Sequence, residues 1–134
     1  MRLVKKLKLE ENVRFHNRFL TKEGLMQYLQ ATDVYICPYI KKEQLSSGTV
    51  TYALVAGKPI ISTPFYYAEE LLAEGRGILC KFGSPRSITD GIKHLLDNPE
   101  EKARIEKLAY EHGQGMTWPR VASTYVDLFK EYAQ

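Results

Sequence analysis

A chain of 134 residues is long enough for one domain with a single core and too short for two. Its net charge of +3 is too small to indicate a nucleic-acid-binding surface, although it is compatible with an acidic ligand such as a nucleotide diphosphate. No apolar stretch approaches the length of a membrane span, and Met1 to Glu11 lacks the apolar region of a secretory signal.

The first part of the chain predicts two helix–strand pairs. Arg2 to Lys8 resembles the end of an amphipathic helix, and Val13 to His16 (VRFH) has the pattern of a short strand. Thr21 can cap a second helix, whose apolar residues recur at helical spacing. Asp33 to Pro38 (DVYICP) is a nearly continuous apolar run, which is typical of a strand buried on both faces.

The middle of the chain continues this alternation. A polar loop, Tyr39 to Leu45, precedes a helix that Gly57 is expected to end. Short apolar runs bounded by Gly and Pro then indicate two further strands, with a helix between them. The elements expected here are a helix at Ser46 to Ala56, a strand at Pro59 to Thr63, a helix at Tyr66 to Glu74 and a strand at Gly77 to Phe82.

The last part of the chain predicts three helices. Ser84 and Pro85 form a capped helix start, and Asn98-Pro99 separates this helix from the next. From Trp118 to Tyr132 apolar residues recur every three or four positions, which predicts a docked amphipathic helix. Strands alternating with helices predict one α/β domain with a parallel sheet of about four short strands and flanking helices.

Ligands of open parallel sheets bind beyond the carboxyl ends of the strands. The helix that follows the most buried strand starts with Ser46, Ser47, Gly48 and Thr49. Small and hydroxyl side chains leave the backbone N–H groups of a helix start open to an anion. Capping of the helix by Ser46 or Ser47 alone is the structural alternative. Lys41 and Lys42 are possible cations of the preceding loop, with plain solvation as their alternative.

The segment Gln44 to Pro59 (QLSSGTVTYALVAGKP) resembles the signature segment of family 4 glycosyltransferases. Asp33 to Tyr39 is similar to the strand before this signature, and Glu70 to Lys81 is similar to the stretch after it. The resemblance spans nearly the whole chain. It implies that residues 1–134 are a partial nucleotide-sugar-binding domain, Rossmann-like and of GT-B type, from the C-terminal half of such an enzyme.

The resemblance also implies roles for single residues. Gln44 and Tyr52 stand where the family has two glutamates, the first facing the donor sugar and the second holding the ribose. Glu43 supplies the first carboxylate if the loop shifts by one residue, so Glu43 and Gln44 are the catalytic candidates. Asn17 and Arg18 occupy a position similar to the base-binding turn of the family, with a solvated loop as their alternative.

The resemblance implies the donor-binding part of a retaining hexosyltransferase, which moves a sugar from a nucleotide diphosphate sugar to an acceptor. It implies no cofactor, because such chemistry requires no metal and the sequence has no Asp-x-Asp to hold one. Two strands and an N-terminal acceptor domain are expected to be missing, so the chain alone is expected to be inactive. The alternatives are a non-catalytic flavodoxin-like module that binds a nucleotide or protein, and a purely structural half-domain.

Two further expectations concern assembly and location. If the missing strands leave an open edge, Val13 to His16 is expected to pair directly beside Asp33 to Pro38, and the remaining apolar surface is expected to form a homodimer. Cys37 and Cys80 are interpreted as free buried thiols, which are typical of a reducing compartment. The expected location is therefore the cytoplasm.

Overall fold

The computed structural model describes residues 2–133 and contains an α/β fold with a small parallel sheet. The strands are β1 (Tyr35–Cys37), β2 (Ile60–Ser62) and β3 (Ile78–Leu79), in the order β1-β2-β3. Tyr35 is level with Ile60 across the first pair, and Ile61 is level with Ile78 across the second. The predicted fold class and the parallel direction of the sheet are confirmed.

The fourth predicted strand, Val13 to His16, does not form, so the direct pairing beside β1 is wrong. Only Val13 of this segment is even half-buried, and the Phe15 side chain is 48% exposed. The His16 ring instead packs edge-on against Tyr28, with ring centroids 5.3 Å apart. The alternating sequence pattern was insufficient because no layer of this part of the chain covers the apolar side of the segment.

Seven helices are present in residues 2–133, and local signals mark several of their ends. The Thr21 hydroxyl accepts a hydrogen bond from the Gly24 N–H, and the Ser84 hydroxyl accepts one from the Ser87 N–H, as expected of N-caps. Gly57 follows the C-cap residue of the third helix and has a positive φ of 67°, as expected of a helix end. The helices are α1 (Arg2–Lys6), α2 (Lys22–Gln30), α3 (Gly48–Val55), α4 (Tyr66–Leu71), α5 (Pro85–Asp97), α6 (Pro99–Gln114) and α7 (Trp118–Tyr132).

The central strand β2 is buried on both faces, because helices cover both sides of the sheet. The expectation that Asp33 to Pro38 holds the most buried strand is wrong, because β1 lies at an edge of the sheet and Ile36 is 38% exposed. Successive side chains of a strand point to opposite faces. Ile60 accordingly belongs to a core with residues of α3 and α4, whereas Ile61 belongs to a second core with Leu95 of α5 and Ile105 of α6. This arrangement places the start of α3 beside the carboxyl end of β1.

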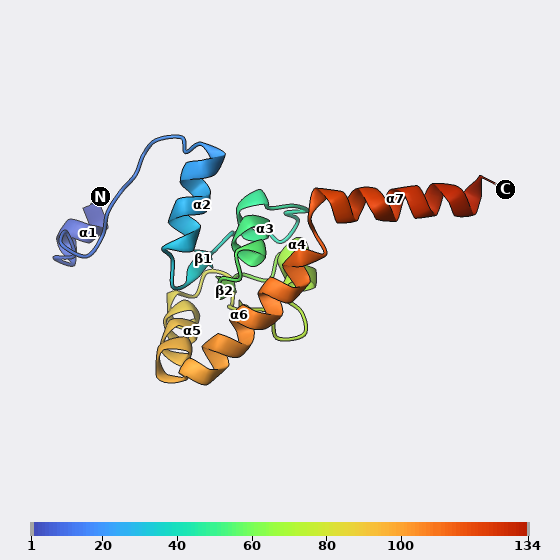
Figure 1. Cartoon of the computed structure of the whole chain (residues 1–134). Coiled ribbons are helices and arrows are strands. Elements are labelled where there is room, and N and C mark those ends of the chain that lie inside the picture. The colour runs from blue at the N-terminus through green and yellow to red at the C-terminus, as the bar shows by residue number, and fades with distance from the viewer. Residues whose placement is uncertain (1, 134) are drawn as a thin grey trace.

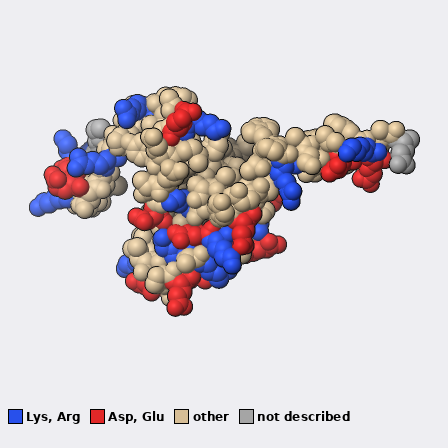
Figure 2. Space-filling view, viewed as in Figure 1, with Lys and Arg blue, Asp and Glu red and all other residues tan. Residues whose placement is uncertain are grey.

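The last helix, α7, does not dock, so that prediction is wrong. Figure 1 shows α7 projecting from the body of the molecule, and none of its residues is buried. The helix is amphipathic, but no layer in residues 2–133 lies against its apolar stripe. Trp118 is 82% exposed and Phe129 is 67% exposed. Figure 2 shows charged side chains gathered over α5 and α6, with few over α3 and the adjoining part of α7.

Candidate functional site

The first turn of α3 forms the floor of the candidate site. Ser47 is its N-cap, only 6% exposed, and its hydroxyl accepts a hydrogen bond from the Val50 N–H at 3.4 Å. The Ser47 hydroxyl also lies 3.4 Å from the Tyr39 hydroxyl and 3.5 Å from the Thr49 hydroxyl. Gly48 would meet nothing within 4 Å if it carried a Cβ. The helix therefore starts with a fixed cap and an open first residue.

The positive end of the α3 dipole points out of this turn, and helix starts of this kind favour anions. The Ser47 side chain makes the capping contact that was the structural alternative for this residue, and a ligand contact by Ser47 stays a prediction. The backbone N–H groups of the first turn, rather than the serine hydroxyls, are thus the groups available to a ligand.

Two adjoining cavities flank this helix start. The first, the Arg18 cavity, has a volume of about 460 Å³, and the second, the Gly48 cavity, about 540 Å³. The Arg18 cavity is lined by Arg18, Phe19, Leu20, Thr21, Lys22, Leu25, Thr49 and Tyr52. The Gly48 cavity is lined by Lys22, Met26, Gly48, Thr51, Tyr52, Val55, Met116, Thr117, Trp118 and Pro119. Lys22 and Tyr52 belong to both walls and mark the boundary between them.

Four of the sequence-predicted residues meet in these cavities. Arg18, Thr49 and Tyr52 line the Arg18 cavity, while Gly48 and Tyr52 line the Gly48 cavity. Among residues 2–133, neither Arg18 nor Lys22 forms an ion pair with a carboxylate. The two cavities therefore bring two free cations and a phenol to the positive end of a helix.

The other predicted residues, all within the described part of the chain, lie outside both walls. They are Asn17, Glu43, Gln44, Ser46 and Ser47. Glu43 is exposed on the loop between β1 and α3, and the Gln44 amide donates to the Ser46 carbonyl at 2.7 Å. Neither side chain meets Tyr52 or Arg18 in this structure, so their catalytic role stays a prediction.

Lys22 was missed by the sequence analysis, although its position carried a signal. It is the first residue of α2, directly after the Thr21 cap that the sequence indicated. Lys41 and Lys42, the cations that were considered, do not line either cavity. The Lys42 ammonium instead lies 5.5 Å from the centre of the Tyr66 ring.

The groups beneath the α3 start are uncharged at neutral pH. Burial raises the pKa of the Tyr35 phenol, and the Thr49 hydroxyl opposes this only in part. Burial likewise raises the pKa of the Cys37 thiol, against hydrogen bonds to Tyr39, Tyr35 and Ser47. A neutral thiol is a poor nucleophile, so Cys37 is interpreted as a buried packing residue beneath the α3 start.

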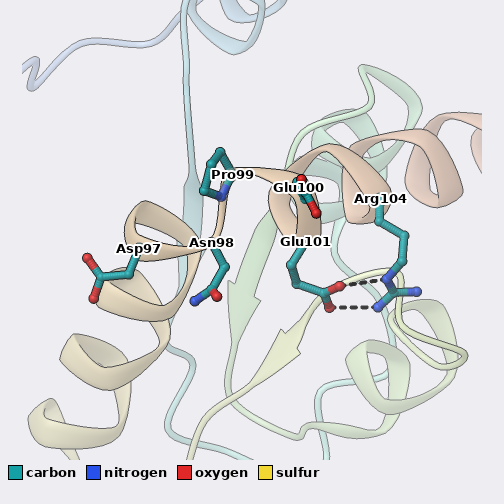
Figure 3. A pocket seen from close by; sticks show the side chains of 6 residues that line it. All are labelled: Asp97, Asn98, Pro99, Glu100, Glu101 and Arg104. Atoms are coloured by element: carbon teal, nitrogen blue, oxygen red, sulfur yellow. Dashed lines mark hydrogen bonds and ion pairs between the residues drawn. The ribbon is translucent and has the colours of Figure 1, made fainter.

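A third cavity, about 640 Å³, lies at the turn between α5 and α6 and has different chemistry. Figure 3 shows the Glu101 carboxylate paired with both nitrogens that Arg104 presents, with N–O distances of 2.7 Å. The Arg104 guanidinium lowers the pKa of Glu101 through this hydrogen bond. Asp97 and Glu100 add further negative charge. Since the cation is already paired, this cavity does not suit an anionic ligand.

Within residues 2–133, no group of three or more His, Cys, Asp or Glu side chains is arranged to hold a metal ion. No helix in this range has the length and apolar character needed to cross a membrane.

Comparison with known proteins identifies the family. The model of the family described as glycosyl transferases group 1 matches residues 1–112. An uncharacterised glycosyltransferase of Methanocaldococcus jannaschii is 29% identical over 114 residues, covering 81% of this chain and 28% of that protein. A D-inositol 3-phosphate glycosyltransferase of Corynebacterium glutamicum is 27% identical over 131 residues, covering 96% of this chain and 30% of that protein. The chain thus spans less than a third of these relatives.

Solved structures share the fold. Sucrose-phosphate synthase of Thermosynechococcus elongatus superposes with a TM-score of 0.82 at 20% identity, over 97% of this chain and 32% of that one. HepE of Anabaena, in complex with UDP, superposes with a TM-score of 0.77 at 20% identity, over 94% of this chain and 35% of that one. With the family match over most of its length, the chain belongs to the group 1 glycosyl transferases and has the GT-B type of fold.

Proposed function

We propose that this chain is the donor-binding part of a retaining hexosyltransferase, which takes its sugar from a nucleotide diphosphate sugar. The observation that carries the proposal is the convergence of Arg18, Lys22 and the positive end of α3 on two adjoining cavities. A nucleotide diphosphate needs this combination of an apolar wall, hydrogen-bond donors and positive charge. HepE, which has a similar fold, was solved in complex with UDP, and this supports the proposal.

The proposal assigns the nucleoside to the Arg18 cavity. Leu20 and Leu25 offer apolar contact to a flat base, and Arg18 can donate to its polar edge. Tyr52 lies at the boundary with the Gly48 cavity, where its hydroxyl or ring face can meet the ribose. A phenol there provides a hydrogen bond without the negative charge of a carboxylate.

The diphosphate is assigned to the first turn of α3. Backbone N–H groups from Ser46 to Thr49 and the dipole of α3 favour its negative charge, and Lys22 stands at the same boundary. During transfer the leaving diphosphate gains charge while the sugar carbon becomes oxocarbenium-like. Preorganised donors aimed at that charge lower the barrier without a metal ion.

The catalytic step needs groups beyond these cavities. Glu43 and Gln44 on the β1–α3 loop are assigned to the side facing the donor sugar, and the acceptor is assigned to a part of the enzyme outside this chain. The chain alone is therefore proposed to bind donor and not to transfer sugar. A cytoplasmic location belongs to the same proposal, supported by the free, buried Cys37 and Cys80.

Calorimetric titration with UDP, GDP and ADP tests the donor site. At least one nucleotide should bind, and Arg18→Ala should weaken that binding about tenfold, the scale of a lost charge-assisted hydrogen bond. Arg86→Ala provides the control, because Arg86 is also exposed but lies on α5. Equal weakening by both substitutions would point to general charge attraction and would overturn the assigned site.

A further inference from the structure

The loop between β1 and α3 is held at its start by the segment that follows β2. The Thr63 hydroxyl donates to the Tyr39 carbonyl at 2.5 Å, and the Tyr39 ring packs on Phe65 with ring centroids 5.0 Å apart. Thr63 and Phe65 are both buried, so this first anchor is part of the core. It leaves the following residues of the loop, from Ile40 onward, exposed to solvent.

A second anchor holds the middle of the loop, and Tyr66 supplies both of its components. The Tyr66 backbone N–H donates to the Lys42 carbonyl at 3.0 Å. The Lys42 ammonium lies 5.5 Å from the centre of the Tyr66 ring, within the range of a cation–π contact. The two contacts join the first residue of α4 to the residue directly before Glu43.

The backbone contact is specific to this loop. The first N–H groups of a helix have no partner within the helix, so the Tyr66 N–H needs one from elsewhere. Residue Tyr66 opens α4, and its N–H finds that partner in the loop. Tyr67, the next residue, bonds α3 through a 2.7 Å contact between its hydroxyl and that of Thr51. The first turn of α4 therefore contacts both the β1–α3 loop and α3 itself.

We infer that Tyr66 is a positioning residue, which holds the loop carrying Glu43 and Gln44 against α4; the importance of that loop rests on the proposed function. The Tyr66 side chain is 50% exposed, so the protein core does not require it. Its ring and its N–H fix Lys42, and through Lys42 they limit where the next two side chains can lie. Tyr66 itself is not assigned a contact with the donor.

Amide hydrogen exchange measured by NMR on the chain tests this inference directly. Because the Tyr66 N–H has no partner within α4, its protection reports the contact with Lys42 alone. Tyr66→Phe keeps the ring and should leave the exchange rate at residue 66 unchanged. Tyr66→Leu and Lys42→Gln should each raise that rate about two- to fivefold, the factor expected for loss of an exposed cation–π contact. The double variant should exchange no faster than either single variant.

Tyr132→Leu is the matched control, because Tyr132 is a 77% exposed tyrosine on α7. An unchanged rate in Tyr66→Leu, or additive effects in the double variant, would overturn the inference. So would an unprotected amide at residue 66 in the wild type. Tyr66→Pro removes the N–H as well, and Phe65, with φ −78° and ψ 155°, already has the conformation that a following proline requires. In that variant the amide signals of Glu43 and Gln44 should move toward random-coil positions; unmoved signals contradict the inference.

Titration of the same variants with UDP, GDP and ADP separates this inference from the proposed function. A wild-type chain that protects residue 66 but binds none of the three would overturn the donor site and leave the anchor intact. A chain that binds a nucleotide while the amide of residue 66 is unprotected would overturn the anchor and leave the donor site intact.

Discussion

Gly113 allows α6 to approach α3 closely, and its replacement by alanine should lower the free energy of unfolding. A Cβ at this position would lie 2.7 Å from the Val55 Cα and 3.2 Å from the Leu54 carbonyl oxygen. An ordinary carbon–carbon contact is about 3.5–4.0 Å, so the two helices would have to separate by roughly 1 Å. Since α3 carries Gly48, Thr49 and Tyr52, this approach also sets the position of the candidate site.

Two opposing effects decide the magnitude at Gly113. Overpacking of this kind costs about 1–3 kcal/mol. Alanine is preferred to glycine in a helix interior by about 1 kcal/mol, and Gly113 lies near the end of α6, where that gain is smaller. We therefore expect a net loss of about 1–2 kcal/mol, because the clash involves backbone atoms that cannot rotate away.

Gly91→Ala is the matched control, since Gly91 is also a buried helical glycine. Its Cβ would lie 3.4 Å from Ile78 Cγ2 and 3.5 Å from Ile61 Cδ1, which are ordinary contacts. The greater helix preference of alanine should then prevail, and the free energy of unfolding should rise by about 0.5–1 kcal/mol. Urea unfolding followed by circular dichroism measures both variants. A Gly113→Ala variant at least as stable as the wild type would refute the reasoning.

Three further outcomes are expected. Ser47→Ala should lower the free energy of unfolding by about 1 kcal/mol through loss of the α3 cap, measured by the same urea assay; an unchanged midpoint would contradict the capping role. Burial raises the pKa of Tyr35, Cys37 and Cys80 in the folded state. Their contribution to the free energy of unfolding is therefore complete below the pKa of the unfolded state, which is 9.0 for the thiols. It is lost as the pH rises through the higher pKa values of the folded state. The melting temperature should therefore fall steadily above about pH 9, and a melting temperature that rises there would contradict this prediction. The exposed apolar stripe of α7 should drive a homodimer, so sedimentation equilibrium should show dimer at micromolar concentration and Phe129→Lys should give monomer; a monomeric wild type would refute it.

Local signals in the sequence were sufficient wherever a few neighbouring residues decide the structure. The caps at Thr21 and Ser84 and the helix end at Gly57 are of this kind. The short apolar run at Pro59 to Thr63 also predicted the buried strand β2 correctly. These features needed no knowledge of distant contacts.

Features that depend on a partner layer could not be predicted in this way. Val13 to His16 and α7 both have the pattern of a packed element, yet residues 2–133 provide no surface for either. Periodicity reports which face of an element is apolar and does not report whether another layer reaches it.

The candidate site was predictable in part. The helix start proposed to bind an anion was indicated by the small and hydroxyl residues of the sequence, and Arg18 and Tyr52, which line one cavity beside it, were indicated by the resemblance. Lys22 joined the site only through the way α2 lies against α3, and Tyr66 joined the loop only through the turn after β2. Both depend on contacts between segments far apart in the chain, which spacing along a sequence does not record.

The position of a bound nucleotide is the most direct test of the central claim. We expect titration of the labelled chain with UDP, GDP or ADP to shift the amide signals of Gly48, Thr49 and Tyr52, together with Arg18 and Lys22. Signals of Asp97 to Arg104, which line the cavity between α5 and α6, should not move. Shifts confined to the cavity between α5 and α6, or no shifts at millimolar concentration of any of the three nucleotides, would contradict a donor site at the start of α3.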